Sequence, residues 1–167
     1  ALADELKDDA VEFFVIGEGA MKDKLLQEKA DRGLKKLHII SYQPRELMPS
    51  LIAYSDLQFI FMASHTEGHG FPSKVYTIMA CAKPLVVCSG ENTPIINFLN
   101  GKNCAFMVTK KDVQFKVNSI ANFIRTTPKK ELERMGKNGY VNIANNYSKV
   151  KVTGEYVMLI DGLLKEF

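Results

Sequence analysis

The stretch "LQFIFMASHTEGHGFPSKVYTIMACAKPLVVC", residues 57–88, decides the fold. It opens with an apolar run at 57–62, passes through a loop with two glycines and two histidines, and then has helical spacing over 73–82. A second apolar run follows at 84–88. Short and nearly continuous apolar runs are typical of strands buried on both faces of a parallel sheet. The stretch therefore predicts a strand, a loop, a helix and a second, parallel strand.

The same alternation continues on both sides of this stretch. Apolar runs at 11–16, 37–40 and 105–108 predict three further strands, and helical spacing over 21–33, 44–54 and 93–100 predicts the helices between them. Repeated strand–helix–strand units require right-handed crossovers, which place helices on both faces of a parallel sheet. We therefore expect an α/β, Rossmann-like fold.

No strand is expected after Val108. Helices are predicted at 112–126, from Pro128 onward and from Ser148 to the end, so residues 109–167 form a helical tail of a single domain, 1–167. The last of these helices has an apolar stripe made of Val152, Tyr156, Leu159, Ile160, Leu163 and Leu164. Such a stripe is most simply core, and docking on another domain is the alternative.

Composition excludes several classes of protein. The chain is 46% hydrophobic and 25% charged, as is usual for a soluble globular domain. Its net charge of +3 is spread along the chain, with no basic run interleaved with aromatics, so no nucleic-acid partner is expected. No apolar run approaches the roughly 18 residues of a membrane span. The start "ALADELKDD" has no initiator Met, and we expect a fragment of a longer, cytoplasmic protein.

The cysteines give no sign of a metal or redox site. Cys81, Cys88 and Cys104 lie in apolar stretches and lack CxxC spacing. We expect them to be free, small core residues in a reducing compartment.

The loops at the carboxyl ends of the strands are the candidate ligand sites, since open α/β sheets bind ligands there. In the loop after the third strand, Gly68 and Gly70 free the main chain to surround an anion with its amides. Ser73 and Lys74 begin the next helix and offer a hydroxyl and an ammonium to a phosphate. The carboxylate of Glu67 beside such a site could accept hydrogen bonds from neutral hydroxyl groups, such as those of a sugar. A plain surface loop is the alternative.

A second glycine turn follows the first strand. Gly17 and Gly19 begin a dinucleotide fingerprint, but Lys22 stands in the third glycine's place and no acidic residue follows the second strand. A tight turn and a ligand loop are equally compatible with this pattern. His65 and His69 have no partner at metal-ligand spacing, so we expect no metal.

Taken in order, four segments resemble a known family. They are "FFVIGEGAMKDKLLQEKA" (13–30), "LHIISYQPRELMPSLIAYSDLQFIFM" (37–62), "EGHGFPSKVYTIMACAKPLVV" (67–87) and "NTPIINFLNGKNCAFMV" (92–108). Residues 11–108 resemble the carboxy-terminal, donor-binding domain of group 1 (family 4-like, retaining) glycosyltransferases, enzymes of the two-domain GT-B type. The "PSK" variant is most similar to transferases of capsule, colanic-acid and lipopolysaccharide assembly. The resemblance implies transfer of a sugar from a nucleotide sugar to a glycan or lipid-linked acceptor, with no metal and no further cofactor.

The resemblance also implies roles for single residues. Glu67 matches the catalytic glutamate that contacts the donor sugar. The matched substrate-binding positions are Gly17, Gly19, Tyr42, Gln43, Pro44, Gly68, His69, Gly70, Phe71, Pro72, Ser73 and Lys74. The family's second glutamate, which holds the ribose, is absent. Val75 stands at its usual spacing, and the "PSK" alignment places Thr77 there instead.

The family's domain also opens with a strand and an arginine–lysine loop that have no counterpart here. We therefore expect either that the run at 11–16 pairs directly with the run at 57–62, or that another chain or further residues fill the gap. The acceptor would bind through a missing amino-terminal domain, so the isolated chain should be inactive. The full-length protein could also associate peripherally with a membrane.

Three other functions stay open. The first is a degenerate, non-catalytic scaffold module that has lost the second glutamate. The second is a nicotinamide-dependent oxidoreductase, which the incomplete fingerprint disfavours. The third is an epimerase or phosphorylase of the same architecture.

Overall fold

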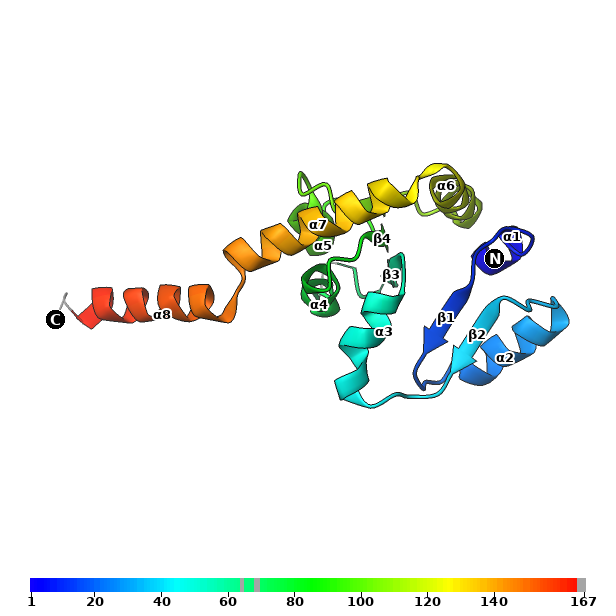
Figure 1. The fold of residues 1–167 in the computed structure, drawn as a ribbon, viewed down its shortest axis with the longest axis horizontal. Coiled ribbons are helices and arrows are strands. Elements are labelled where there is room, and N and C mark those ends of the chain that lie inside the picture. The colour runs from blue at the N-terminus through cyan, green and yellow to red at the C-terminus, as the bar shows by residue number, and fades with distance from the viewer. Residues whose placement is uncertain (64, 68–69, 165–167) are drawn as a thin grey trace. The chain divides into compact units, whose positions relative to one another are not determined.

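The computed structural model describes residues 1–63, 65–67 and 70–164 (Figure 1). All five predicted strands are present, shortened by up to two residues at an end. They are β1 (Phe13–Ile16), β2 (Leu37–Ile40), β3 (Gln58–Phe61), β4 (Leu85–Cys88) and β5 (Ala105–Val108). Every strand pairing is parallel, as predicted.

The described strands form two sheets, β1-β2 and β3-β4-β5. The chain divides into two compact units. Unit 1 is Ala1–Leu51 with Lys110–Thr127, and unit 2 is Ile52–Thr109 with Pro128–Phe167. Neither sheet contains both β1 and β3, so the first of the two alternatives, direct pairing of these strands, is wrong. The second, that another chain or further residues fill the gap, stays a prediction.

Unit 1 contains the β1-β2 sheet and the helices α1 (Leu2–Glu5), α2 (Lys22–Asp31) and α6 (Val113–Thr126). The α2 helix packs on β2, and α1 packs on α6. Gly33 follows α2 with φ +60°, the left-handed conformation that favours glycine at a helix end. Asp112 caps α6 by accepting a hydrogen bond from the Phe115 N–H at 2.6 Å.

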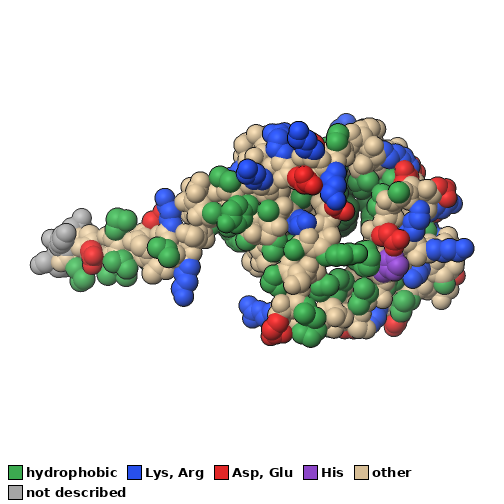
Figure 2. All heavy atoms as spheres, in the orientation of Figure 1, with side chains coloured by type: hydrophobic (Ala, Val, Ile, Leu, Met, Phe, Trp, Pro, Cys, Tyr) green, Lys and Arg blue, Asp and Glu red, His purple; other side chains and the backbone are tan. Residues whose placement is uncertain are grey.

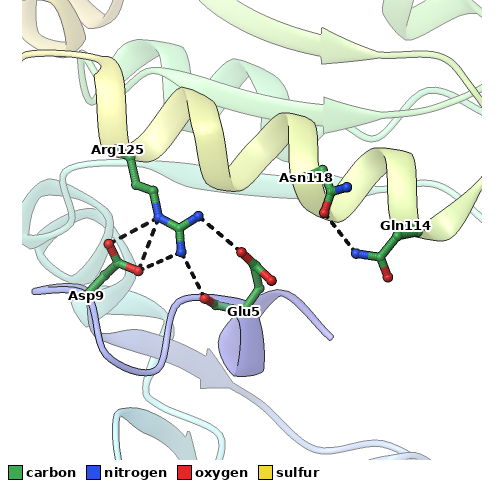
Figure 3. Close-up of polar contacts among 5 residues, drawn as sticks. All are labelled: Glu5, Asp9, Gln114, Asn118 and Arg125. Carbon is green, nitrogen blue, oxygen red and sulfur yellow. Dashed lines mark hydrogen bonds and ion pairs between the residues drawn. The ribbon is translucent and has the colours of Figure 1, made fainter.

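A cluster of ion pairs joins the amino-terminal segment to α6 (Figure 3). The Arg125 guanidinium donates to the Asp9 carboxylate at 2.9 Å and to Glu5 Oε1 at 3.1 Å, and it also donates to the Glu5 carbonyl oxygen at 3.0 Å. These bonds connect residues about 120 positions apart in the sequence. They therefore fix α1 and the turn after it against the carboxyl end of α6.

Unit 2 is built around β4, all four residues of which are buried. Its helices are α4 (Lys74–Ala80), α5 (Pro94–Leu99), α7 (Lys129–Asn146) and α8 (Lys149–Leu164). The α7 helix packs on α4. Its buried core includes Ile60, Val75, Ile78, Met79, Leu85, Val87, Ile95, Leu99 and Cys104. Cys88 and Cys104 are buried and Cys81 is partly so, as expected of small core residues.

The boundary between the units falls within α3 (Met48–Tyr54). A short 3-10 helix, η1 (Arg45–Leu47), precedes it, so the predicted helix at 44–54 is split into two pieces.

The prediction that α8 is core is wrong. No described residue of α8 is buried, and Val150, Met158 and Leu164 are 84%, 70% and 70% exposed. Hydrophobic side chains gather along this helix, which lies at the left in Figure 2. Within the described part of the chain, no helix is both long and apolar enough to cross a membrane.

Candidate functional site

Two loops of unit 2 leave the carboxyl edge of the β3-β4-β5 sheet side by side. The Met62 N–H donates to the Cys88 carbonyl at 2.9 Å, and the Ser89 N–H donates to the Val108 carbonyl at 3.3 Å. The loop after β3 and the loop after β4 therefore start from neighbouring strands. This is the edge at which open α/β sheets bind ligands.

The loop after β3 begins with a tight turn that positions Glu67. The N–H groups of Thr66 and Glu67 both donate to the Ala63 carbonyl, at 2.8 and 3.1 Å. The Thr66 hydroxyl donates to the same oxygen at 2.9 Å. Glu67, the predicted catalytic residue, is half-buried at the end of this turn.

The same loop surrounds a shallow hollow of about 370 Å³, lined by Met62, His65, Thr66, Gly70, Phe71 and Pro72. Three of the predicted substrate-binding residues, Gly70, Phe71 and Pro72, are therefore in its wall. The predicted residues Gly68 and His69 lie outside the described residues. Sequence reasoning left out Met62 and Thr66, because neither residue type carries a recognisable binding signal.

The predicted residues of α4 lie on its exposed face. Ser73, Lys74 and Thr77 are exposed, whereas Val75 is fully buried along with its neighbours one turn on. Residues three or four apart lie side by side on a helix, so Thr77 neighbours both Lys74 and Ser73. Val75 stands at the usual spacing of the family's second glutamate. Its burial means that this position offers no side chain to a ligand.

Lys74 places an ammonium group on the exposed face of α4. Surrounding protein atoms partly desolvate it and lower its pKa from the ordinary value of 10.5, although the side chain as a whole is exposed. Burial disfavours the charged form of a lysine. Because the side chain still reaches water, we expect it to be a cation at neutral pH, with a weaker hold on its proton.

An aromatic cluster anchors the end of the loop. The Phe71 ring lies 5.1 Å from the Phe98 ring in an edge-on arrangement and 5.4 Å from the Tyr76 ring. Phe98 in turn contacts Tyr147, at 5.5 Å between ring centroids. Aromatic pairs at these separations stabilise a fold beyond the area they bury. Phe71 is thereby tied to α4, α5 and the residue that follows α7.

Unit 1 carries the predicted residues of the first glycine turn. Gly17 directly follows β1 with φ +139°, a conformation that only glycine adopts readily, and its N–H donates to the Ile40 carbonyl at 3.0 Å. The Gly19 carbonyl accepts the Lys22 N–H at 3.0 Å, so Gly19 forms the turn into α2. The glycines therefore lie in a tight turn at the strand's end, and a ligand role for this turn stays a prediction.

A polar network that the sequence analysis did not propose closes this turn. The Lys22 ammonium donates to Glu18 at 2.7 Å and to the Ser41 hydroxyl at 3.0 Å. Hydrogen bonds with Lys22 and Ser41 hold the pKa of Glu18 below its usual range. Glu18 lies before α2 begins at Lys22, so no helical spacing rule marked this contact in the sequence.

After β2, Tyr42 and Pro44 are exposed and Gln43 is partly buried. Tyr42 is 72% exposed, and the Gln43 side chain donates to the Ser41 carbonyl at 3.1 Å. Pro44 has an extended backbone (φ −52°, ψ 141°) and leads into η1. These three predicted residues belong to the same unit as Gly17 and Gly19.

Among the described residues, no three His, Cys, Asp or Glu side chains form a group that could hold a metal ion. The expectation of a metal-independent site stays a prediction.

Comparison with known proteins identifies relatives of this chain. Residues 1–142 match the family "Glycosyl transferases group 1". WcaI of Escherichia coli K12, whose name assigns it to colanic acid biosynthesis as a glycosyl transferase, is 25% identical over 93 residues, which are 56% of this chain and 23% of WcaI.

Two solved structures have the same fold. Anabaena HepE, solved in complex with UDP, is 19% identical with a TM-score of 0.73, and the match covers 96% of this chain and 44% of HepE. WaaG, a glycosyltransferase involved in lipopolysaccharide biosynthesis, is 14% identical with a TM-score of 0.66, covering 88% of this chain and 38% of WaaG. This chain thus spans less than half the length of each of these three proteins.

These likenesses confirm the α/β, Rossmann-like fold of a GT-B glycosyltransferase. The family match extends over most of the chain, from the first residue to the carboxyl end of α7. The chain therefore belongs to the glycosyl transferases group 1 family.

Proposed function

We propose that this chain is the donor-binding domain of a cytoplasmic, retaining glycosyltransferase. The enzyme would transfer a sugar from a nucleotide sugar to a glycan or lipid-linked acceptor in cell-surface polysaccharide biosynthesis. Family membership and the likeness to WcaI support this assignment. The observation that carries it is the loop after β3. Glu67 is placed there by a tight turn, Gly70, Phe71 and Pro72 line the hollow, and the exposed Ser73, Lys74 and Thr77 follow directly in the sequence.

The chemistry proposed for this site is electrostatic. Charge develops on the departing diphosphate, and a cation held beside it stabilises the transition state. Lys74 supplies that cation, and the Ser73 hydroxyl donates to a phosphate oxygen. Glu67 accepts a hydrogen bond from a sugar hydroxyl and so orients the ring. The Thr77 hydroxyl takes the place of the family's ribose-binding carboxylate, without its charge.

A non-catalytic scaffold is the second candidate function. The full burial of Val75 favours it, because the usual position of the second glutamate is closed to a ligand. A scaffold would have no need of a nucleotide, whereas a donor-binding domain must bind one. Nucleotide binding therefore separates the two candidates.

The test is calorimetry of the 167-residue chain with UDP, GDP, ADP and CDP and with a sugar nucleotide of each. We expect at least one to bind, and Lys74→Ala to weaken that binding about tenfold to a hundredfold, because a hydrogen bond to a charged group contributes about 1.5–3 kcal/mol. Lys149→Ala, which removes the exposed first lysine of α8, is the matched control and should bind like the wild type.

Two results would contradict the proposal. If no nucleotide binds to this chain or to the full-length protein, the scaffold is the better assignment. If Lys74→Ala binds as tightly as the wild type, the diphosphate does not lie at α4. We further expect the chain alone to show no transfer of sugar, since the acceptor would bind to another part of the enzyme.

A further inference from the structure

The backbone conformation of Gly90 does not require a glycine. It follows β4, two residues after Cys88, and its φ lies outside the left-handed region that favours glycine. A Cβ placed on Gly90 would instead lie 2.7 Å from Oε2 of Glu67 and 3.4 Å from its carboxyl carbon. The side chain of Glu67 therefore occupies the space that any larger residue at position 90 would need.

The main chain at Gly90 is held firmly in place. Ser89 is 2% exposed, and its N–H bonds to β5. The hydroxyls of Ser89 and Thr93 lie 2.9 Å apart, and the Thr93 hydroxyl donates to the Gly90 carbonyl at 3.1 Å. Both side chains are buried, so the turn cannot readily relax. Glu67, with a long and flexible side chain, is the partner that can move.

We propose that Gly90 is a positioning residue for Glu67. The bare main chain at Gly90 forms the wall against which the Glu67 carboxylate rests, and this contact sets where the carboxylate meets the donor sugar. The contact itself is independent of function, whereas its effect on a sugar rests on the function proposed above. A methyl group at position 90 would push the Glu67 carboxylate away from this wall, and the carboxylate would then no longer lie where it meets the donor sugar.

A positioning role and a purely structural role of Gly90 predict different effects of Gly90→Ala. In Gly90→Ala the closest atom is the far end of a flexible side chain, so rotation of Glu67 relieves the overlap at little cost in stability. The expected variant is therefore folded, with a displaced carboxylate. A purely structural glycine would give the opposite result, with a loss of stability and no selective change at Glu67.

The first test needs no ligand. Carboxyl ¹³C NMR of the 167-residue chain is recorded for the wild type and for Gly90→Ala, with the Glu155 resonance on α8 as the internal reference. We expect the Glu67 resonance to shift and the Glu155 resonance to stay in place. An unchanged Glu67 resonance in a folded Gly90→Ala variant would overturn the proposal.

The second test measures the effect on the sugar. Calorimetry compares UDP with UDP-glucose and GDP with GDP-mannose for the wild type, Gly90→Ala, Glu67→Ala and the double variant. We expect Gly90→Ala to weaken the sugar nucleotide about tenfold while its nucleoside diphosphate binds unchanged, because only the sugar meets Glu67. In the Glu67→Ala background, the Gly90→Ala change should have no further effect, since residues that act as one unit are not additive.

The outcomes distinguish the two proposals. If the wild type binds none of these probes while the Glu67 resonance still shifts, the positioning contact stands and the proposed donor binding fails. If the probes bind and Gly90→Ala leaves the sugar nucleotide unaffected, the positioning role is refuted. Gly154→Ala on α8, where a methyl group would meet no atom of the described chain within 4 Å, controls for the glycine-to-alanine change itself.

Discussion

Gly136 on α7 lies so close to Ala82, after α4, that a Cβ on Gly136 would overlap the Ala82 carbonyl oxygen. The same Cβ would stand 2.7 Å from the Ala82 carbonyl carbon and 3.3 Å from the Lys83 Cα. All of these are backbone atoms, so no side-chain rotation can relieve the overlap. Ala82 itself has φ +52°, a left-handed conformation that turns its carbonyl group toward α7.

We therefore expect Gly136→Ala to destabilise the protein by about 3 kcal/mol, at the upper end of the usual cost of overpacking. Urea denaturation measures the change. Gly154→Ala, in the interior of α8 with open space around it, is the control and should gain about 0.5–1 kcal/mol from helix propensity. Equal effects of the two substitutions would contradict the close approach of α7 to α4.

The Asp9–Arg125 pair should make stability depend on pH. Hydrogen bonds from Arg125 lower the pKa of Asp9 from its ordinary value of 3.8. A carboxylate whose pKa is lower in the folded state stabilises the protein above the unfolded value, and this contribution is lost as the pH falls through the folded value. The difference in unfolding free energy between the wild type and Asp9→Asn should therefore be constant above about pH 5 and shrink below 3.8.

Urea denaturation of both proteins between about pH 2.5 and 7, a range that includes the titration of carboxylates, measures this difference in unfolding free energy. Asp161→Asn on α8 is the control substitution and should not change the unfolding free energy at neutral pH. A wild-type advantage over Asp9→Asn that grows as the pH falls would contradict the assignment.

Donor binding should depend on the protonation of Lys74. Desolvation lowers the pKa of this lysine from 10.5, so its positive charge is lost at a lower pH than that of an ordinary lysine. If the ammonium holds the diphosphate, the affinity for the best-binding nucleoside diphosphate should fall as the pH rises toward 10.5. Lys74→Arg keeps its charge throughout this range and should show a flatter profile. If the affinity falls equally with pH in the wild type and in Lys74→Arg, Lys74 is not the group whose loss of charge weakens binding.

The rings of Phe71 and Phe98 should be energetically coupled. They lie 5.1 Å apart with an interplanar angle of 79°, the edge-on geometry that aromatic pairs prefer. A double-mutant cycle with Phe71→Leu and Phe98→Leu should give a coupling of about 0.5–1.5 kcal/mol in unfolding free energy. Phe71→Leu combined with Val150→Ala, at a residue 84% exposed on α8, should be additive. Additivity in both pairs would show that the aromatic cluster does not anchor the loop.

Local pattern predicted most of this fold. The five strands are continuous apolar runs with turn residues on each side, and this pattern alone located them. Burial on both faces was predicted for all five, but only β4 has all four residues buried, whereas Phe14 in β1 and Phe61 in β3 are 50% and 60% exposed. Helix ends were located within one or two residues where a cap marks them. For example, α7 begins at Lys129, one residue after the start predicted at Pro128. Rules that act within a few residues were therefore reliable here.

Features that depend on residues distant in the sequence were not predictable in the same way. The contacts of Gly90 with Glu67 and of Gly136 with Ala82 join residues 23 and 54 positions apart, and no local pattern marks either glycine as a site of close approach. The α8 helix has the spacing of a core helix, yet its apolar side chains stay exposed. A periodic stripe specifies which face of a helix is apolar, and it does not specify what covers that face.

The exposed face of α8 allows a last prediction. Leu159 and Ile160 are 61% and 54% exposed, so they gain little from burial in this chain. Replacing either with Gln, which has a similar or better helix propensity, should change the unfolding free energy by no more than about 0.5 kcal/mol. Ile143→Ala on α7, at a residue 9% exposed, should in contrast cost about 2–5 kcal/mol. A loss at Leu159 or Ile160 as large as that at Ile143 would mean that α8 packs against another surface in solution.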